Sequence, residues 1–70
     1  MTLKKLLKQP EYRPYTTIEI VDIVNHWTFK TGIYASFYTK PLQKYFKKLL
    51  KRKVEKVYVN NDMILTVEIY

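Results

Sequence analysis

Residues 16–24 read Thr-Thr-Ile-Glu-Ile-Val-Asp-Ile-Val and decide the fold, because they fit both a helix and a strand. Thr16 and Glu19 have the spacing of a capping box, in which both side chains bond to backbone N–H groups at a helix start. Strict strand alternation fails at two adjacent apolar pairs, and helical spacing instead relates Ile20, Ile23, Val24 and Trp27. The pattern favours a helix that begins near Thr16 and ends near Gly32, the single glycine.

The alternative is a strand, because residues 18–24 are rich in β-branched side chains, which are enriched in strands. Residues 33–38 fit a loop, a short strand or a helical turn. If both segments are strands, the fold becomes ββαββ.

The N-terminal segment Thr2–Lys8 predicts a short helix. Its leucines fall on one side of the helix and its lysines on the other, which is the pattern of an amphipathic helix. Pro10 and Pro14 then bound an extended link, since each proline disfavours helix at the residue before it.

The clearest helix follows Thr39, which serves as N-cap, with Pro41 in the first turn. At about 100° per residue, one face is apolar and comprises Leu42, Tyr45, Phe46, Leu49 and Leu50. The opposite face gathers Lys40, Lys44, Lys47, Lys48 and Lys51, with Gln43 at its edge.

The last segment predicts a β-hairpin. Residues 54–59 and 63–70 are rich in β-branched and aromatic side chains, and Asn60-Asn61-Asp62 separates them. A three-residue loop would set Val57 opposite Leu65, Val59 opposite Met63, and Tyr58 opposite Ile64.

This order of elements resembles the winged helix-turn-helix superfamily. The segment Tyr15-Thr16-Thr17-Ile18-Glu19-Ile20 looks like the entry to that family's second helix. The segment Pro41-Leu42-Gln43-Lys44-Tyr45-Phe46-Lys47-Lys48-Leu49-Leu50-Lys51-Arg52 looks like its third helix, which reads DNA. The resemblance implies one α+β domain over residues 1–70, with three helices followed by a C-terminal hairpin that forms the wing.

The charge supports a nucleic-acid partner. Thirteen Lys and Arg residues against six Asp and Glu give a net charge of +7 and a pI near 9.7. Between Ile23 and Val54 there is no acidic residue. A pI above about 9 with clustered cations is typical of nucleic-acid binders.

We therefore expect a sequence-specific double-stranded DNA-binding protein, a small transcriptional or replication regulator that acts by occupying its site as a homodimer. Lysines would neutralise phosphates, and Gln43 would bond an adenine edge. The candidate DNA-binding residues are Lys40, Gln43, Lys44, Lys47, Lys48, Lys51, Arg52, Asn60 and Asn61. The alternative is a small basic protein of phage or virus type that binds and inhibits another protein.

Other classes of function lack the residues that they need. The chain has no cysteine and one histidine, which excludes disulfides and the usual zinc sites. His26 has no serine or acid arrangement that suggests catalysis, so we expect no enzyme activity and no cofactor. No apolar run approaches the roughly 20 residues that span a bilayer, which predicts a cytoplasmic protein without membrane contact.

Overall fold

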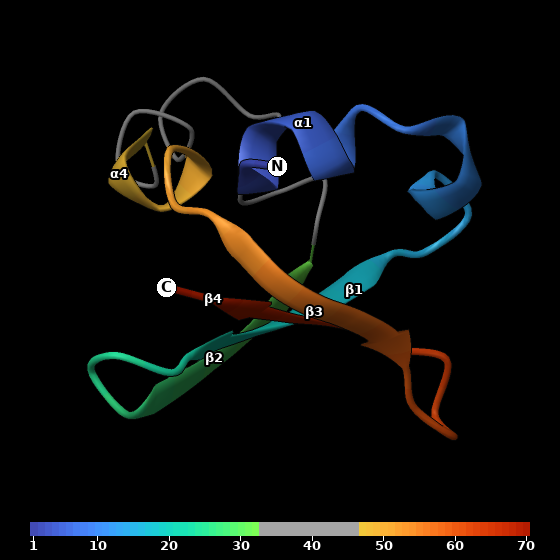
Figure 1. Ribbon diagram of the computed structural model, residues 1–70. Coiled ribbons are helices and arrows are strands. Elements are labelled where there is room, and N and C mark those ends of the chain that lie inside the picture. Colours follow the sequence, from blue (N-terminus) through green and yellow to red (C-terminus); the bar gives the residue numbers. More distant parts are fainter. Residues whose placement is uncertain (33–46) are drawn as a thin grey trace.

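The computed structural model describes residues 1–32 and 47–70. Two short α-helices, one 3₁₀ helix and four strands occur in these ranges (Figure 1). In chain order they are α1 (Leu3–Leu7), η1 (Pro10–Tyr12), β1 (Thr17–Asp22), β2 (Trp27–Gly32), α4 (Lys47–Leu50), β3 (Val54–Val59) and β4 (Leu65–Ile69).

The four strands form one mixed sheet in the order β2-β1-β4-β3. Two antiparallel hairpins, β1–β2 and β3–β4, lie side by side, and their central strands β1 and β4 are parallel. β2 and β3 are therefore the two edge strands, and α4 precedes β3 in the chain. Figure 1 shows α1 and α4 above the same side of the sheet, so the described domain has a helix layer and a sheet layer.

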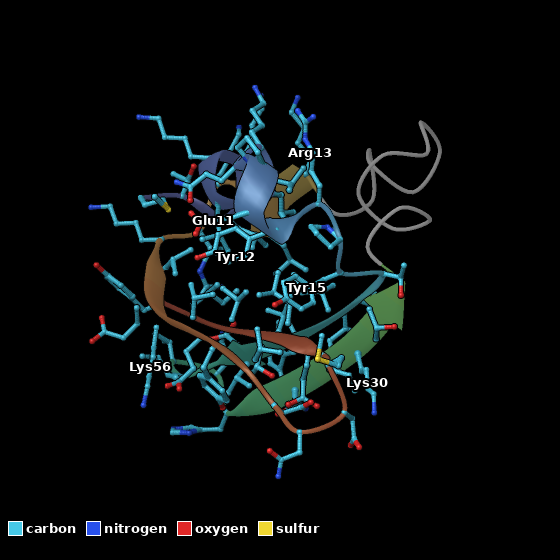
Figure 2. All side chains as sticks on the ribbon, turned by 90° about the vertical axis from the view of Figure 1, so that its right-hand side faces the viewer. Glu11, Tyr12, Arg13, Tyr15, Lys30 and Lys56 are labelled. Atoms are coloured by element: carbon cyan, nitrogen blue, oxygen red, sulfur yellow. The ribbon has the colours of Figure 1, made fainter. Side chains whose placement is uncertain are left out.

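The other side of the sheet, which we call the open face, carries alternate residues of each strand. Glu19 of β1 pairs in register with Lys30 of β2, and Glu68 of β4 pairs with Lys56 of β3. Figure 2 shows Lys30 and Lys56 at the sheet, away from the helix layer. Because each of these lysines faces a glutamate on the neighbouring strand, the positive and negative charges of the open face balance.

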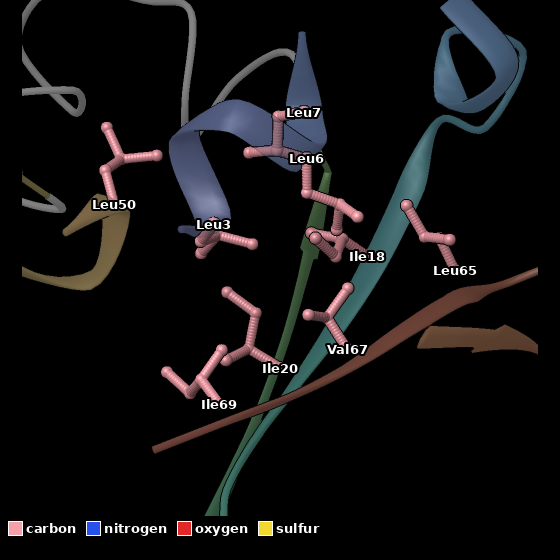
Figure 3. Packing of buried hydrophobic residues seen from close by; sticks show 9 residues of the cluster. All are labelled: Leu3, Leu6, Leu7, Ile18, Ile20, Leu50, Leu65, Val67 and Ile69. Carbon is pink, nitrogen blue, oxygen red and sulfur yellow. The ribbon is translucent and has the colours of Figure 1, made fainter. Parts of the chain in front are cut away.

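The core lies between the helix layer and the sheet (Figure 3). Burying an aliphatic side chain of this size contributes about 1.5–3 kcal/mol, so the three leucines of α1 attach that helix firmly to the sheet. The buried apolar residues are Leu3, Leu6, Leu7, Ile18, Ile20, Leu50, Leu65, Val67 and Ile69. The prediction of an N-terminal amphipathic helix is thereby confirmed, with Thr2 as its N-cap and a 3.3 Å bond from the Lys5 backbone N–H to the Thr2 hydroxyl.

The predicted helix over residues 16–32 is wrong, and so is the winged helix-turn-helix fold that depended on it. These residues form the β1–β2 hairpin, and Gly32 is the last residue of β2 rather than a helix end. The described chain is a small α+β domain with two short helices and a four-stranded mixed sheet, not three helices followed by a hairpin.

The physical reason lies in burial. Ile18, Ile20 and Asp22 alternate on the core side of β1 and are fully buried, while the residues between them lie on the other face. Two neighbouring strands saturate the backbone hydrogen bonds of β1, which favours a strand over the local capping signal of Thr16 and Glu19. The strand alternative for residues 16–24 therefore agrees with β1, while its second predicted strand, residues 33–38, lies outside the described residues.

Two further predictions need correction. The predicted third helix is described only from Lys47, as α4, and ends at Leu50 rather than Arg52, while residues 39–46 lie outside the described ranges. The C-terminal hairpin is confirmed, but its register differs by two residues: Val59 pairs with Leu65 and Val57 with Val67.

The longer turn explains the change of register. The Asn60 side-chain oxygen accepts bonds from the backbone N–H groups of Asp62 (2.9 Å) and Ile64 (3.1 Å). Met63 adopts a left-handed conformation, with φ of 61°. These bonds close a loop over residues 60–64, and β4 consequently begins at Leu65.

Candidate nucleic-acid interface

Exposed lysines gather on the helix layer. The helices α1 and α4 pack against each other. The backbone of Thr2, just before α1, forms a β-bridge with Lys53, just after α4. We call the resulting group the lysine surface, and its members, all exposed, are Lys4, Lys5, Lys8, Lys47, Lys48, Lys51 and Lys53.

These lysines carry uncompensated charge. Within residues 1–32 and 47–70, none of them forms a salt bridge, because the ion pair found there joins Arg52 to Asp22. No acidic residue occurs in residues 1–10 or 47–54, the two segments that carry the lysine surface, although Glu11 and Glu55 follow directly. The helix layer is thus strongly positive, whereas the open face pairs each lysine with a glutamate.

Three of the predicted DNA-binding residues, Lys47, Lys48 and Lys51, belong to this surface. Lys40, Gln43 and Lys44 lie outside the described residues, so the hypothesis that Gln43 reads a base stays a prediction.

Arg52, also a predicted DNA-binding residue, is bonded within the protein. Its two terminal nitrogens, Nη1 and Nη2, donate to Oδ2 and Oδ1 of Asp22, each at 3.0 Å. Its Nε donates to the backbone carbonyl oxygen of Tyr70 at 2.9 Å. Its side chain is 27% exposed. This bidentate geometry is that of a strong, charge-assisted pair, and it commits the guanidinium to the protein itself.

Asp22 was not predicted as an important residue. It is fully buried at the end of β1, where its Oδ1 also accepts from the backbone N–H groups of Val24 and Asn25, each at 3.0 Å. The Arg52 guanidinium is the main cause of a pKa of the Asp22 carboxyl well below its usual range, and the bonds from Asn25 and Val24 act in the same direction against the opposing effect of burial. Asp22 is therefore a structural anion that holds Arg52.

The predicted wing residues lie apart from the lysine surface. Asn60 uses its side-chain oxygen to close the β3–β4 loop, and Asn61 is exposed within that loop. Figure 1 shows this loop at the end of the sheet remote from α4. The structure therefore does not bring Asn60 and Asn61 together with the lysines of α4.

Sequence reasoning missed four members of the surface: Lys4, Lys5, Lys8 and Lys53. The signal for the first three was present, since they occupy the polar side of the predicted N-terminal helix. What the pattern could not show is that α1 packs beside α4, because that packing joins segments about 40 residues apart in the sequence.

Among the described residues, no group of three or more His, Cys, Asp or Glu side chains could hold a metal ion. In the same part of the chain, no helix has the length and apolar character needed to cross a membrane.

Comparison with protein-family models, curated protein sequences and solved structures finds no significant match to this chain.

Proposed function

We propose that this protein binds double-stranded DNA through the phosphate backbone, with the lysine surface as its point of attachment. The observation that carries this proposal is the concentration of seven exposed lysines on one layer of the molecule, opposite a sheet face whose charges are balanced. Lysines that neutralise phosphates release condensed counterions, and this release supplies most of the affinity of backbone binding.

The chemistry of the surface favours binding of phosphates over reading of bases. Its members are all lysines, which act as mobile point charges, whereas bidentate recognition of a guanine edge needs the fork of an arginine. Arg52 lies next to this surface, and its fork is occupied by Asp22. The proposed protein acts in the cytoplasm by occupying a regulatory DNA site. In this proposal, residues outside the lysine surface select the bases.

The test compares three double variants that remove the same charge. Lys4→Ala/Lys5→Ala changes α1, and Lys47→Ala/Lys48→Ala changes α4. Lys30→Ala/Lys56→Ala on the open face is the control. Affinity for a labelled DNA duplex is measured by fluorescence anisotropy over a range of salt concentrations, and the slope of log affinity against log salt reports how many phosphates the protein neutralises. This slope becomes shallower by about 0.9 for each phosphate that a variant no longer neutralises.

The wild-type protein is expected to bind the duplex at about 50 mM salt with a steep slope. Each helix-layer pair is expected to make the slope shallower by up to about 1.8, and the open-face pair to leave it unchanged. Absence of binding at low salt, or an equal change in all three variants, would refute the proposal. Displacement of the duplex by an acidic polypeptide at equal charge concentration would assign the surface to an acidic protein partner instead.

A further inference from the structure

One residue joins the two lysine-bearing segments to the sheet. The backbone carbonyl of Arg52 accepts from the N–H of Leu3, the first residue of α1, at 2.9 Å. Its own N–H donates at 3.0 Å to the carbonyl of Leu49 in α4. Its side chain bonds Asp22 at the end of β1 and the Tyr70 carbonyl beyond β4. Arg52 therefore contacts both helices and both central strands or their ends.

The helix α1 is too short to hold its own position. It has five residues, whereas isolated helices below about 12 residues are marginal in water. The direction in which its lysines extend thus depends on tertiary packing. Lys51 and Lys53 depend most directly on Arg52, because they are its neighbours in the chain.

We propose that the Asp22–Arg52 ion pair positions the lysine surface and thereby sets how many phosphates it neutralises, without touching DNA itself. This inference rests on the proposed function. The buried carboxylate fixes the guanidinium in a bidentate geometry, and the guanidinium fixes the segment between α4 and β3. Without the pair, the segment from Lys51 to Lys53 loses the side-chain link from Arg52 to the end of β1, while the backbone bond from the Tyr70 N–H to the Lys53 carbonyl remains.

The proposal predicts an effect opposite to that of simple charge. Asp22→Asn raises the net charge from +7 to +8, which by long-range electrostatics alone strengthens DNA binding. Positioning by the ion pair predicts weaker binding and a salt slope that is shallower by about 0.9 for each phosphate left unneutralised. Glu11→Gln is the matched control, because it makes the same change of charge at an exposed residue. It is expected to bind DNA as tightly as the wild type or tighter.

Arg52→Lys provides a second variant, which keeps the charge and removes the fork. Circular dichroism at low temperature establishes that each variant is folded before binding is measured. A variant that is less stable but still folded, with its lysines in place, keeps the wild-type salt slope. A shallower slope for folded Asp22→Asn and Arg52→Lys, with an unchanged slope for Glu11→Gln, supports the proposal. If Asp22→Asn does not fold, Arg52→Lys decides.

Two outcomes separate this inference from the proposed function. If the wild-type slope depends on the helix-layer lysines but the folded Asp22→Asn or Arg52→Lys variant keeps that slope, the positioning role is overturned and DNA binding stands. If wild-type binding does not depend on the helix-layer lysines, the proposed function fails and the positioning role fails with it.

Discussion

Ile18 and Val24 distinguish the observed strand from the helix that the sequence favoured. Ile18 is 0% exposed and faces the core from β1, whereas Val24 follows β1 and is 59% exposed. Truncating a buried isoleucine to alanine costs about 2–5 kcal/mol, and a domain of 70 residues has a total stability of roughly 3.5–10 kcal/mol at 0.05–0.15 kcal/mol per residue. Ile18→Ala should therefore remove a large part of the stability, while Val24→Ala should change it by less than about 0.5 kcal/mol.

The assay is urea unfolding followed by circular dichroism, with Ile18→Val as a milder variant that costs about 0.5–1.5 kcal/mol and stays folded if Ile18→Ala does not. In the helical interpretation Val24 belongs to the apolar face, and its truncation would be the damaging one. A larger loss of stability for Val24→Ala than for Ile18→Val would refute the strand assignment.

Three further changes test local features of the structure. Met63→Gly relieves the left-handed φ of 61° at Met63, whose side chain is 66% exposed. It should raise the free energy of unfolding by about 0.5–1 kcal/mol, which is the strain removed less the entropy cost of glycine. A lower urea midpoint would contradict this. Thr66→Val removes a buried hydroxyl oxygen that has no hydrogen-bond partner among the described residues. It should raise the urea midpoint by the equivalent of about 1 kcal/mol, and a lower midpoint would show that the hydroxyl is satisfied. The pKa of Asp22 is lower in the folded protein than its ordinary value of 3.8, so the unfolded chain binds a proton first on acidification. Thermal stability should therefore be constant above about pH 5 and fall below about pH 4. Asp22→Asn should flatten that fall, and an unchanged pH profile in this variant would contradict the linkage.

Local patterns were sufficient where an element depends on its own residues. The spacing of Leu3, Leu6 and Leu7 predicted α1 because one face of a short helix meets the core there. The β-branched residues on either side of Asn60 predicted the C-terminal hairpin for the same reason. The predicted register of this hairpin was wrong because its loop includes Met63 in a left-handed conformation. The sequence does not indicate this conformation, because methionine rarely adopts it.

The β1–β2 hairpin could not be predicted from local patterns because its decisive partners are distant. Ile18 pairs in parallel with Leu65, about 47 positions away, and this pairing makes β1 a central strand. The alternation of β1 is difficult to recognise in the sequence. The third core-facing residue of this strand is Asp22, and a carboxylate is normally expected on the surface. It is buried because Arg52 lies opposite, 30 residues further along the chain.

The candidate interface was predicted only in part, because it too depends on the packing of segments that are distant in the sequence. The lysines of the basic segment were evident from charge alone, and Lys47, Lys48 and Lys51 are exposed together. Arg52 looked equally available in the sequence, because nothing local indicates that its guanidinium is paired. Charge composition predicts a polyanionic partner, but only packing shows which cations are free to meet it.

The most direct test of DNA binding by the lysine surface is a titration of the ¹⁵N-labelled protein with duplex DNA, followed by amide chemical shifts. We expect the largest changes in α1, in α4 and at residues 51–53, with little change at Lys30 and Lys56 on the open face. Changes concentrated on the open face, or none at low salt, would contradict the account.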